Sequence, residues 1–317
     1  MTSVAAVFDR VPYSRGHTQQ IVHMTRLQLG DAYEFPWTPT TPVHSAPFEE
    51  PRKMTIPLFH VDAFTDRPFA GNPAAVCLLP SWKADRWLQA VAREMNLSET
   101  AFLVKQPDHF DLRWFTPKIE VDLCGHATLA SAHVLWRQGQ AAGDEIRFST
   151  RSGILTALNE QGEIELNFLL EPDEPAPPPV NLVAALNISP TYVGKNRFDY
   201  IVEVNSENTL RHLEPDFRLL ATVPCRGVIV TSRSADPQFD FVSRAFFPRL
   251  GVDEDPVCGS AHCCLVNFWG KRLGKSEFVA YQVSARGGVV KVRVVKDRVF
   301  LSGKATTVAK GEVLVGE

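Results

Sequence analysis

Two short turns, each formed by a cysteine and a glycine, are the first residues in this sequence that suggest chemistry. Cys124-Gly125 and Cys258-Gly259 each precede an apolar stretch long enough for a helix. A helix N-terminus presents unpaired N–H groups and partial positive charge. Two such ends converging from opposite sides would bind a carboxylate without a cofactor. A cysteine at a helix N-terminus also has a lowered pKa, so Cys124 and Cys258 are candidates for the two bases of a racemase.

Glu99 competes with the cysteines for the role of base. It lies in the stretch Asn-Leu-Ser-Glu-Thr at residues 96–100, between an amphipathic helix and a strand. A carboxylate near a buried junction has a raised pKa, which suits proton transfer near neutrality. The alternatives are a surface glutamate that caps a loop and cysteines that are small buried fillers. The residues alone therefore leave the identity of the base open.

Three further polar residues stand close to the same turns. His126 is one residue into its helix, where a neutral imidazole can relay a proton, and Ser260 offers a hydroxyl at the matching position. Asp255 precedes the second turn, where it can orient a substrate amine or a histidine. The structural alternative for Asp255 is that an acid before a helix N-terminus favours the helix dipole.

An internal repeat places these residues in two related halves. Residues 113–122 match residues 244–253 at a constant offset of 131, with Arg, Phe, Pro, Val and Asp recurring. The Cys-Gly turns follow at an offset of 134, and residues 149–153 match residues 284–288 at 135. Related halves that face each other create a cleft, which is a favoured ligand position. At an offset of 131, Glu99 corresponds to Val230, so only one half carries a carboxylate there.

The same elements are expected in both halves. Residues 127–136 and 261–269 have no polar face, which is typical of a helix buried on all sides. Alternating segments follow at 154–168 and 289–301 and predict strands. The pattern predicts a buried helix wrapped by strands, present twice. We expect three segments, with a proline-rich border between the second and the third: 1–54, 55–175 and 176–317.

Residues 1–54 lack sustained periodicity and are expected to be a poorly ordered extension. The first 30 residues contain Arg10, Arg15 and Arg26 but only one acid, Asp9. This composition is a weak signal for an organelle transit peptide, and an unstructured tail or a mispredicted start codon is the favoured alternative.

Composition excludes several classes of partner. The chain has 317 residues, 44% hydrophobic and 22% charged, with a formal net charge of −3. The absence of a basic stripe argues against a nucleic-acid partner, and no apolar run reaches the roughly 18–20 residues of a membrane helix. The six cysteines include no CxxC pair, and no glycine-rich phosphate loop occurs. We therefore expect no metal, no cofactor and a cytoplasmic protein with reduced thiols.

As a set, these motifs resemble the PhzF-like family of phenazine biosynthesis proteins, within the diaminopimelate epimerase-like superfamily. They resemble most the eukaryotic phenazine biosynthesis-like domain-containing proteins, including plant members. The match covers about residues 55–317 and is carried by these stretches: Asp62-Ala-Phe, Gly71-Asn72-Pro73, Asn96-Leu-Ser-Glu99-Thr, Arg113-Trp-Phe-Thr-Pro117, Cys124-Gly-His-Ala-Thr128 and Glu254-Asp-Pro-Val-Cys-Gly-Ser-Ala261.

The resemblance implies an α+β fold of two pseudo-symmetric domains, each a β-barrel-like sheet wrapped around a central helix. It also implies an active site in the interdomain cleft, a cofactor-independent isomerase and a homodimer. Glu99 matches the glutamate that shuttles a proton in the family, and His126 and Asp255 match residues of its catalytic site. The substrate, a small carboxylate-bearing metabolite, is expected to contact the following residues: Asn72, Cys124, Gly125, Cys258, Gly259 and Ser260.

One departure from the family keeps a second hypothesis open. The phenazine enzyme lacks the cysteine pair, whereas diaminopimelate epimerase uses one cysteine from each half. This chain has Cys124 and Cys258 as well as Glu99. We favour Glu99 because its whole sequence context is intact. The alternatives are a two-cysteine racemase or epimerase and a catalytically silent interaction protein on the same fold.

Overall fold

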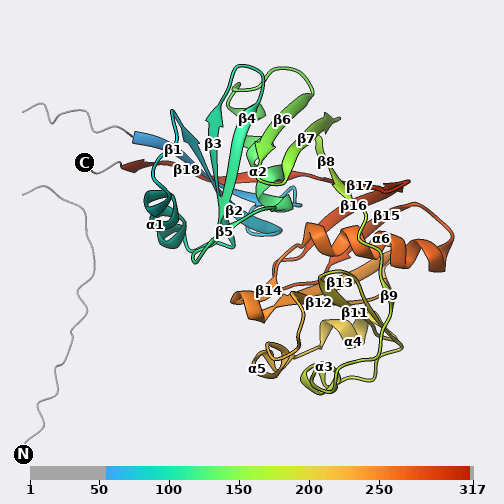
Figure 1. Ribbon diagram of the computed structural model, residues 1–317. Coiled ribbons are helices and arrows are strands. Elements are labelled where there is room, and N and C mark those ends of the chain that lie inside the picture. The colour runs from blue at the N-terminus through green and yellow to red at the C-terminus, as the bar shows by residue number, and fades with distance from the viewer. Residues whose placement is uncertain (1–54, 315–317) are drawn as a thin grey trace, which may run out of the picture. The chain divides into compact units, whose positions relative to one another are not determined.

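Strands surround one buried helix in each half of the chain. The computed structural model describes residues 55–314, so the expected N-terminal extension lies outside the described residues. Helix α2 (Gly125–Arg137) lies among the blue and green strands, and helix α6 (Gly259–Leu273) lies among the orange and red strands (Figure 1). The predicted pair of buried helices is therefore present.

The elements alternate between strands and helices along the described chain. Up to residue 175 they are β1 (Thr55–Ala63), β2 (Asn72–Leu79), α1 (Asp85–Met95), β3 (Glu99–Lys105), β4 (Phe110–Phe115), β5 (Glu120–Val121), α2, β6 (Glu145–Thr150), β7 (Gly153–Glu160), β8 (Glu163–Leu169) and β9 (Glu174–Pro175). The remaining elements are α3 (Val180–Leu186), β10 (Tyr192–Lys195), β11 (Asp199–Glu203), α4 (Glu207–Arg211), α5 (Phe217–Leu220), β12 (Gly227–Arg233), β13 (Phe241–Phe247), the 3₁₀ helix η1 (Pro248–Leu250), β14 (Val252–Asp255), α6, β15 (Glu277–Gln282), β16 (Gly288–Val295), β17 (Arg298–Gly303) and β18 (Ala305–Leu314).

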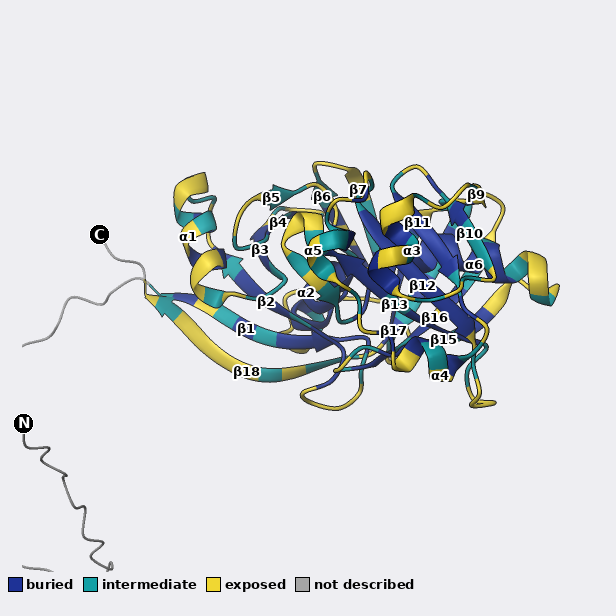
Figure 2. Ribbon diagram, turned by 90° about the horizontal axis from the view of Figure 1, so that it is seen from below, coloured by how far each residue is buried: buried dark blue, intermediate teal, exposed yellow. Residues whose placement is uncertain are grey.

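Helix α2 is buried on every side from His126 to Leu135. A buried helix has no water to satisfy its polar side chains, so they must find partners within the protein. The hydroxyl of Thr128 donates to the carbonyl of Cys124 at 2.6 Å, and that of Ser131 donates to the carbonyl of Ala127 at 2.7 Å. Because these bonds satisfy its hydroxyl groups, helix α2 can fill the centre of the sheet without water. By contrast, α1 is amphipathic and exposes one face (Figure 2).

The strands join into one continuous sheet. Strand β17 pairs with β8, and the last strand β18 returns to pair with β1. All the described residues belong to one compact unit. The border between residues 175 and 176 remains a prediction. Strand β18 follows that border in sequence but pairs with β1, a strand of the first half. None of the described helices has the length and apolar character needed to cross a bilayer.

Arg286, a residue of the repeat, ties the turn before β2 to the other half. Its guanidinium donates to the carboxylate of Asp62 at 2.7 Å, and also to the carbonyls of Gly71 at 2.8 Å and Ala70 at 3.0 Å. Gly71 is required in this turn: its φ is +63°, and a Cβ would lie 2.1 Å from the carbonyl oxygen of Ala63. The turn holds Asn72, so Arg286 fixes where that side chain lies.

Arg286→Gln should lower the free energy of unfolding by about 3 kcal/mol, because it leaves the carboxylate of Asp62 buried without its cation. Asp62 is 1% exposed. The matched control is Arg151→Gln at the equivalent position of the repeat, where the side chain is 52% exposed. That change should cost less than about 1 kcal/mol. Urea denaturation of both variants tests the difference, and equal losses would contradict it.

Candidate active site

The two Cys-Gly turns bring the N-termini of α2 and α6 together. Cys124 and Cys258 are the N-cap residues, both with extended backbone, and Gly125 and Gly259 begin the helices. A Cβ placed on Gly125 would lie 3.8 Å from the Cα of Gly259. Two helix ends that face each other this closely concentrate unpaired N–H groups and partial positive charge. The predicted convergence of the two turns is therefore present in the structure.

Glu99 lies beside the first of these helix ends. It is the first residue of β3, which runs parallel to β2. Its carboxylate oxygen Oε2 lies 3.2 Å from Nε2 of His126, and its side chain is 18% exposed. The two atoms are close but not aligned as a hydrogen bond. The carboxylate is thus held near the helix end with capacity left to accept a proton.

Asn72 connects residues from the two halves. Its side chain is fully buried, and its amide nitrogen lies 2.5 Å from Oδ1 of Asp255 and 3.0 Å from the carbonyl oxygen of Val257. The same nitrogen lies 3.1 Å from Nδ1 of His126. The sequence suggested that Asn72 contacts the substrate. In the structure its amide nitrogen is directed at protein acceptors, whereas its buried Oδ1 has no hydrogen-bond partner among the described residues, so the contact with substrate stays a prediction.

The contact with Asn72 favours one tautomer of His126. The amide nitrogen of Asn72 has two N–H groups for three acceptors, and donation to Nδ1 would place the ring proton on Nε2. Burial lowers the pKa of His126 to about 3, which keeps the ring neutral at physiological pH. A neutral ring whose Nε2 lies 3.2 Å from Oε2 of Glu99 can relay a proton to that carboxylate once the two atoms align.

The two carboxylates of the site have raised pKa values. Burial, followed by the negative charge of Asp255, raises the pKa of Glu99 to about 8, against a hydrogen bond from Cys124 that lowers it. Burial also raises the pKa of Asp255 to about 6, although contacts with Cys258 and Asn72 lower it. A carboxyl that titrates near neutrality both takes and returns a proton efficiently.

The expected lowering of the cysteine pKa values is wrong. Cys124 and Cys258 are only 7% and 6% exposed. Burial raises the pKa of both thiols well above the ordinary value, and the charge of Glu99 raises that of Cys124 further. Desolvation and the nearby carboxylates outweigh the helix dipole, because the dipole carries only a partial charge. Both side chains nevertheless lie in the site: Cys124 Sγ is 3.6 Å from Nδ1 of His126.

The raised pKa of Glu99 predicts how stability changes with pH. A carboxyl whose folded pKa lies above its ordinary value of 4.5 favours folding while it is protonated, and this contribution is lost as the pH rises through 8. Glu99→Gln, which stays neutral, should raise the melting temperature more at pH 9 than at pH 5. Thermal denaturation at both pH values checks this, and a larger gain at pH 5 would contradict it.

Glu99, Cys124 and His126 also form a group of potential metal ligands, with one atom from each lying within 4.8 Å of the others. Two of these atoms have other neighbours in the site. Nε2 of His126 lies beside the carboxylate of Glu99, and the sulfur of Cys124 lies 3.6 Å from Nδ1.

Strand pairing corrects the repeat alignment of Glu99. Thr100 pairs with Phe115, and Val228 pairs with Phe246. Because Phe115 and Phe246 match in the repeat, Glu99 corresponds to Gly227 rather than Val230. The β12–β13 loop is longer than the β3–β4 loop. The offset of 131, which holds for residues 113–122 and 244–253, therefore does not hold for the strands that precede these loops. Gly227 has no room for a side chain, since a Cβ would lie 2.2 Å from the ring of Phe247.

Two residues of the second helix start, Arg226 and Gln282, were not predicted from the sequence. Arg226 donates to the hydroxyl of Ser260 at 3.1 Å. The buried amide of Gln282 accepts from the backbone N–H of Cys258 at 2.8 Å and donates to the carbonyl of Asp255 at 2.6 Å. Both come from segments that carry no motif, and only the fold brings them to the turn.

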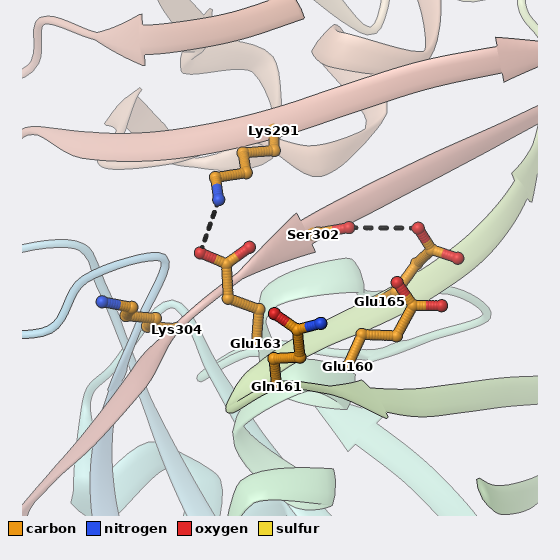
Figure 3. Close-up of a pocket in the computed structure, with 7 residues that line it drawn as sticks. All are labelled: Glu160, Gln161, Glu163, Glu165, Lys291, Ser302 and Lys304. Atoms are coloured by element: carbon orange, nitrogen blue, oxygen red, sulfur yellow. Dashed lines mark hydrogen bonds and ion pairs between the residues drawn. The ribbon is translucent and has the colours of Figure 1, made fainter. Parts of the chain in front are cut away.

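An open pocket elsewhere contains none of the predicted site residues. It has a volume of about 420 Å³ and lies where the β7–β8 turn meets β16 and β17 (Figure 3). Lys291 pairs with Glu163 there at 2.7 Å, and Ser302 donates to Glu165 at 3.2 Å. These contacts occupy two of the three carboxylates that line the pocket, Glu163 and Glu165.

Comparisons with known proteins agree with the fold. A family model described as phenazine biosynthesis-like protein matches residues 61–311. An uncharacterized isomerase of Halalkalibacterium halodurans is 54% identical over 264 residues, which cover 83% of this chain and 100% of that protein. The phenazine biosynthesis-like domain-containing protein of Homo sapiens is 39% identical over 293 residues, covering 81% of this chain and 99% of that protein.

A solved structure gives the same result. The crystal structure of a PhzF-family phenazine biosynthesis protein from Enterococcus faecalis has a TM-score of 0.80 and 42% identity, covering 83% of this chain and 100% of that one. The predicted family and α+β fold class are confirmed, and the bacterial isomerase is more similar than the human relative. The chain belongs to the phenazine biosynthesis-like protein family and is an isomerase.

Proposed function

We propose that this isomerase moves a proton at a carbon next to the carboxylate of a small organic acid, with Glu99 as the acid and base. The observation that carries the proposal is the chain of contacts from Asp255 through Asn72 and His126 to Glu99. It crosses from one half to the other and ends on a carboxylate whose side chain is 18% exposed and whose pKa is raised to about 8. The substrate would lie beside the facing ends of α2 and α6, within reach of Glu99.

The proposed reaction needs no group beyond the chain itself. The ionised carboxylate of Glu99 takes a proton from carbon, and the electron pair left behind spreads into the adjacent unsaturated or carboxylate system. The N–H groups at Gly125 and Gly259 stabilise the negative charge that develops. Protonated Glu99 then returns the proton to another carbon of the same molecule. Reactant and product therefore have the same composition, as an isomerisation requires.

The other site residues support this step. His126, neutral and protonated on Nε2, faces Glu99 and orients its carboxylate. Asp255 acts through Asn72, whose amide it holds in place. Ser260, Cys124 and Cys258 line the substrate space. The homodimer and the cytoplasmic location remain predictions from the sequence.

Deuterium incorporation tests the proposal without knowledge of the natural substrate. The protein in D₂O is incubated with a panel of unsaturated carboxylic acids, hydroxy acids and amino acids, and each acid is followed by proton NMR. In one class of acid we expect protein-dependent incorporation at the carbon that receives the proton, together with exchange at the carbon adjacent to the carboxylate. Incorporation that persists in Glu99→Gln but is lost in Cys124→Ser/Cys258→Ser would replace this proposal with a two-cysteine racemase.

A further inference from the structure

We infer that Arg226 is a positioning residue that holds the hydroxyl of Ser260 ready to donate to an anionic oxygen of the substrate. The inference rests on the proposed function, because that function places Ser260 against the substrate. It adds a substrate feature: a carboxylate or other anionic oxygen on the α6 side of the site, opposite the proton that Glu99 moves.

The first argument is the direction of the contact between Arg226 and Ser260. Nη2 of Arg226 lies 3.1 Å from the Oγ of Ser260. A guanidinium has donors only, so the serine oxygen must accept, and its own O–H is left to donate elsewhere. The other neighbour is the sulfur of Cys258 at 3.3 Å, which is a weak acceptor. An anionic oxygen of a substrate would accept the hydrogen bond from the Ser260 hydroxyl more strongly than this sulfur does.

The second argument is that Arg226 is fixed. Its Nε donates to Oδ1 of Asp199 at 2.8 Å, and Nη2 contacts the second carboxylate oxygen. Asp199 is fully buried, and its own backbone N–H donates to Asn196 Oδ1 at 2.7 Å. The guanidinium lies over the ring of Phe198 at 4.8 Å from its centroid. The planar guanidinium, fixed by Asp199 and by the ring of Phe198, therefore reaches Ser260 in a single orientation. A lysine ammonium, which has neither the planar shape nor the paired donors, cannot reproduce this orientation.

The third argument is the relation between the halves. Glu99 corresponds to Gly227, so Arg226 is adjacent to the position that carries the carboxylate in the other half. His126 and Ser260 are equivalent second residues of the two helices. Glu99 at the start of β3 lies 3.2 Å from His126, and Arg226 just before β12 lies 3.1 Å from Ser260. The repeat thus places a proton acceptor on one side of the site and a hydrogen-bond donor, supported by the pair of Arg226 and Asp199, on the other. This suits a substrate with a proton to lose at one end and an anionic oxygen at the other.

A double-mutant cycle tests whether Arg226 acts through Ser260. Arg226→Lys keeps a positive charge beside Asp199, so the fold does not have to bury an unpaired carboxylate. On the acid whose exchange the protein catalyses, Arg226→Lys and Ser260→Ala should each lower kcat/KM by about tenfold, the usual effect of losing one hydrogen bond to a charged group. The double variant should be no worse than Ser260→Ala, because the two residues form one unit. Losses that multiply would overturn the inference.

Arg197→Gln is the matched control. Arg197 lies over the same Phe198 ring at 4.2 Å from its centroid and pairs with Glu171, but it does not contact Ser260. Its kcat/KM should be unchanged. A loss equal to that of Arg226→Lys would show that packing around Phe198, rather than the Ser260 contact, causes the effect.

Crystal structures of the parent and of Arg226→Lys give a readout that needs no activity. The hydroxyl of Ser260 should occupy one rotamer in the parent and a different or divided one in the variant. An unchanged rotamer overturns the inference even if no acid shows exchange. Failure of the proposed function is seen separately, as absence of exchange in the parent protein.

Discussion

Replacement of Glu99 by glutamine should lower the rate of catalysed proton exchange by about 10²–10⁴-fold, the range expected for loss of a general base. Glutamine has almost the same size, so it should occupy the same partly buried place beside His126. It cannot take a proton from carbon. Because the pKa of Glu99 is raised to about 8, the kcat/KM of the parent should increase with pH as the carboxylate ionises and level off above pH 8. The residual rate of the variant should lack this dependence.

Two controls separate loss of the base from general damage to the site. Glu163→Gln makes the same chemical change in the pocket of Figure 3, where Glu163 pairs with Lys291, and it should leave exchange unchanged. Cys124→Ser/Cys258→Ser replaces both thiols with hydroxyls, and it should keep exchange within about tenfold of the parent, because raised pKa values leave these thiols un-ionised. A double serine variant as inactive as Glu99→Gln would contradict the assignment of Glu99.

Replacement of Gly125 by alanine should lower kcat/KM by about 10²–10³-fold, comparable to the loss of an oxyanion-binding donor. The new methyl group would lie 3.8 Å from the Cα of Gly259, at the contact between the two helix ends. A substrate carboxylate would then be kept away from the backbone N–H groups. The fold should tolerate the change, because the other near atom, a ring carbon of Phe168, is 3.6 Å away, at ordinary contact distance.

Stability and activity should therefore change independently in this variant. Alanine favours a helix over glycine by up to about 1 kcal/mol, so the melting temperature of Gly125→Ala should be equal to or above that of the parent. Gly311→Ala, where a Cβ would meet nothing within 4 Å, should change neither quantity. Full activity in Gly125→Ala, measured by the same deuterium exchange, would show that the substrate does not bind beside the helix ends.

The amino-acid sequence alone determined the elements that repeat locally. The matched blocks identified two halves, and the absence of a polar face predicted that α2 and α6 would be buried. The Cys-Gly turns marked where both helices begin. These signals are local, since hydrophobic periodicity and turn residues specify an element before it meets any other. Glu99, His126, Asp255 and Ser260 were predicted as site residues from their places near these turns and from the family resemblance.

Tertiary structure decided how those residues are coupled. Asn72 is far from both Asp255 and His126 in sequence, and only packing makes it their link. The registers of β3 and β12 show that Glu99 and Gly227 occupy equivalent positions of the repeat. A fixed offset in sequence gave Val230 instead, because the loops that follow the two strands differ in length. Burial raised the cysteine pKa values that the helix ends were expected to lower. The sequence specifies which groups are present, whereas burial, register and the approach of distant segments decide which of them hold a proton, because desolvation and contact depend on the whole fold.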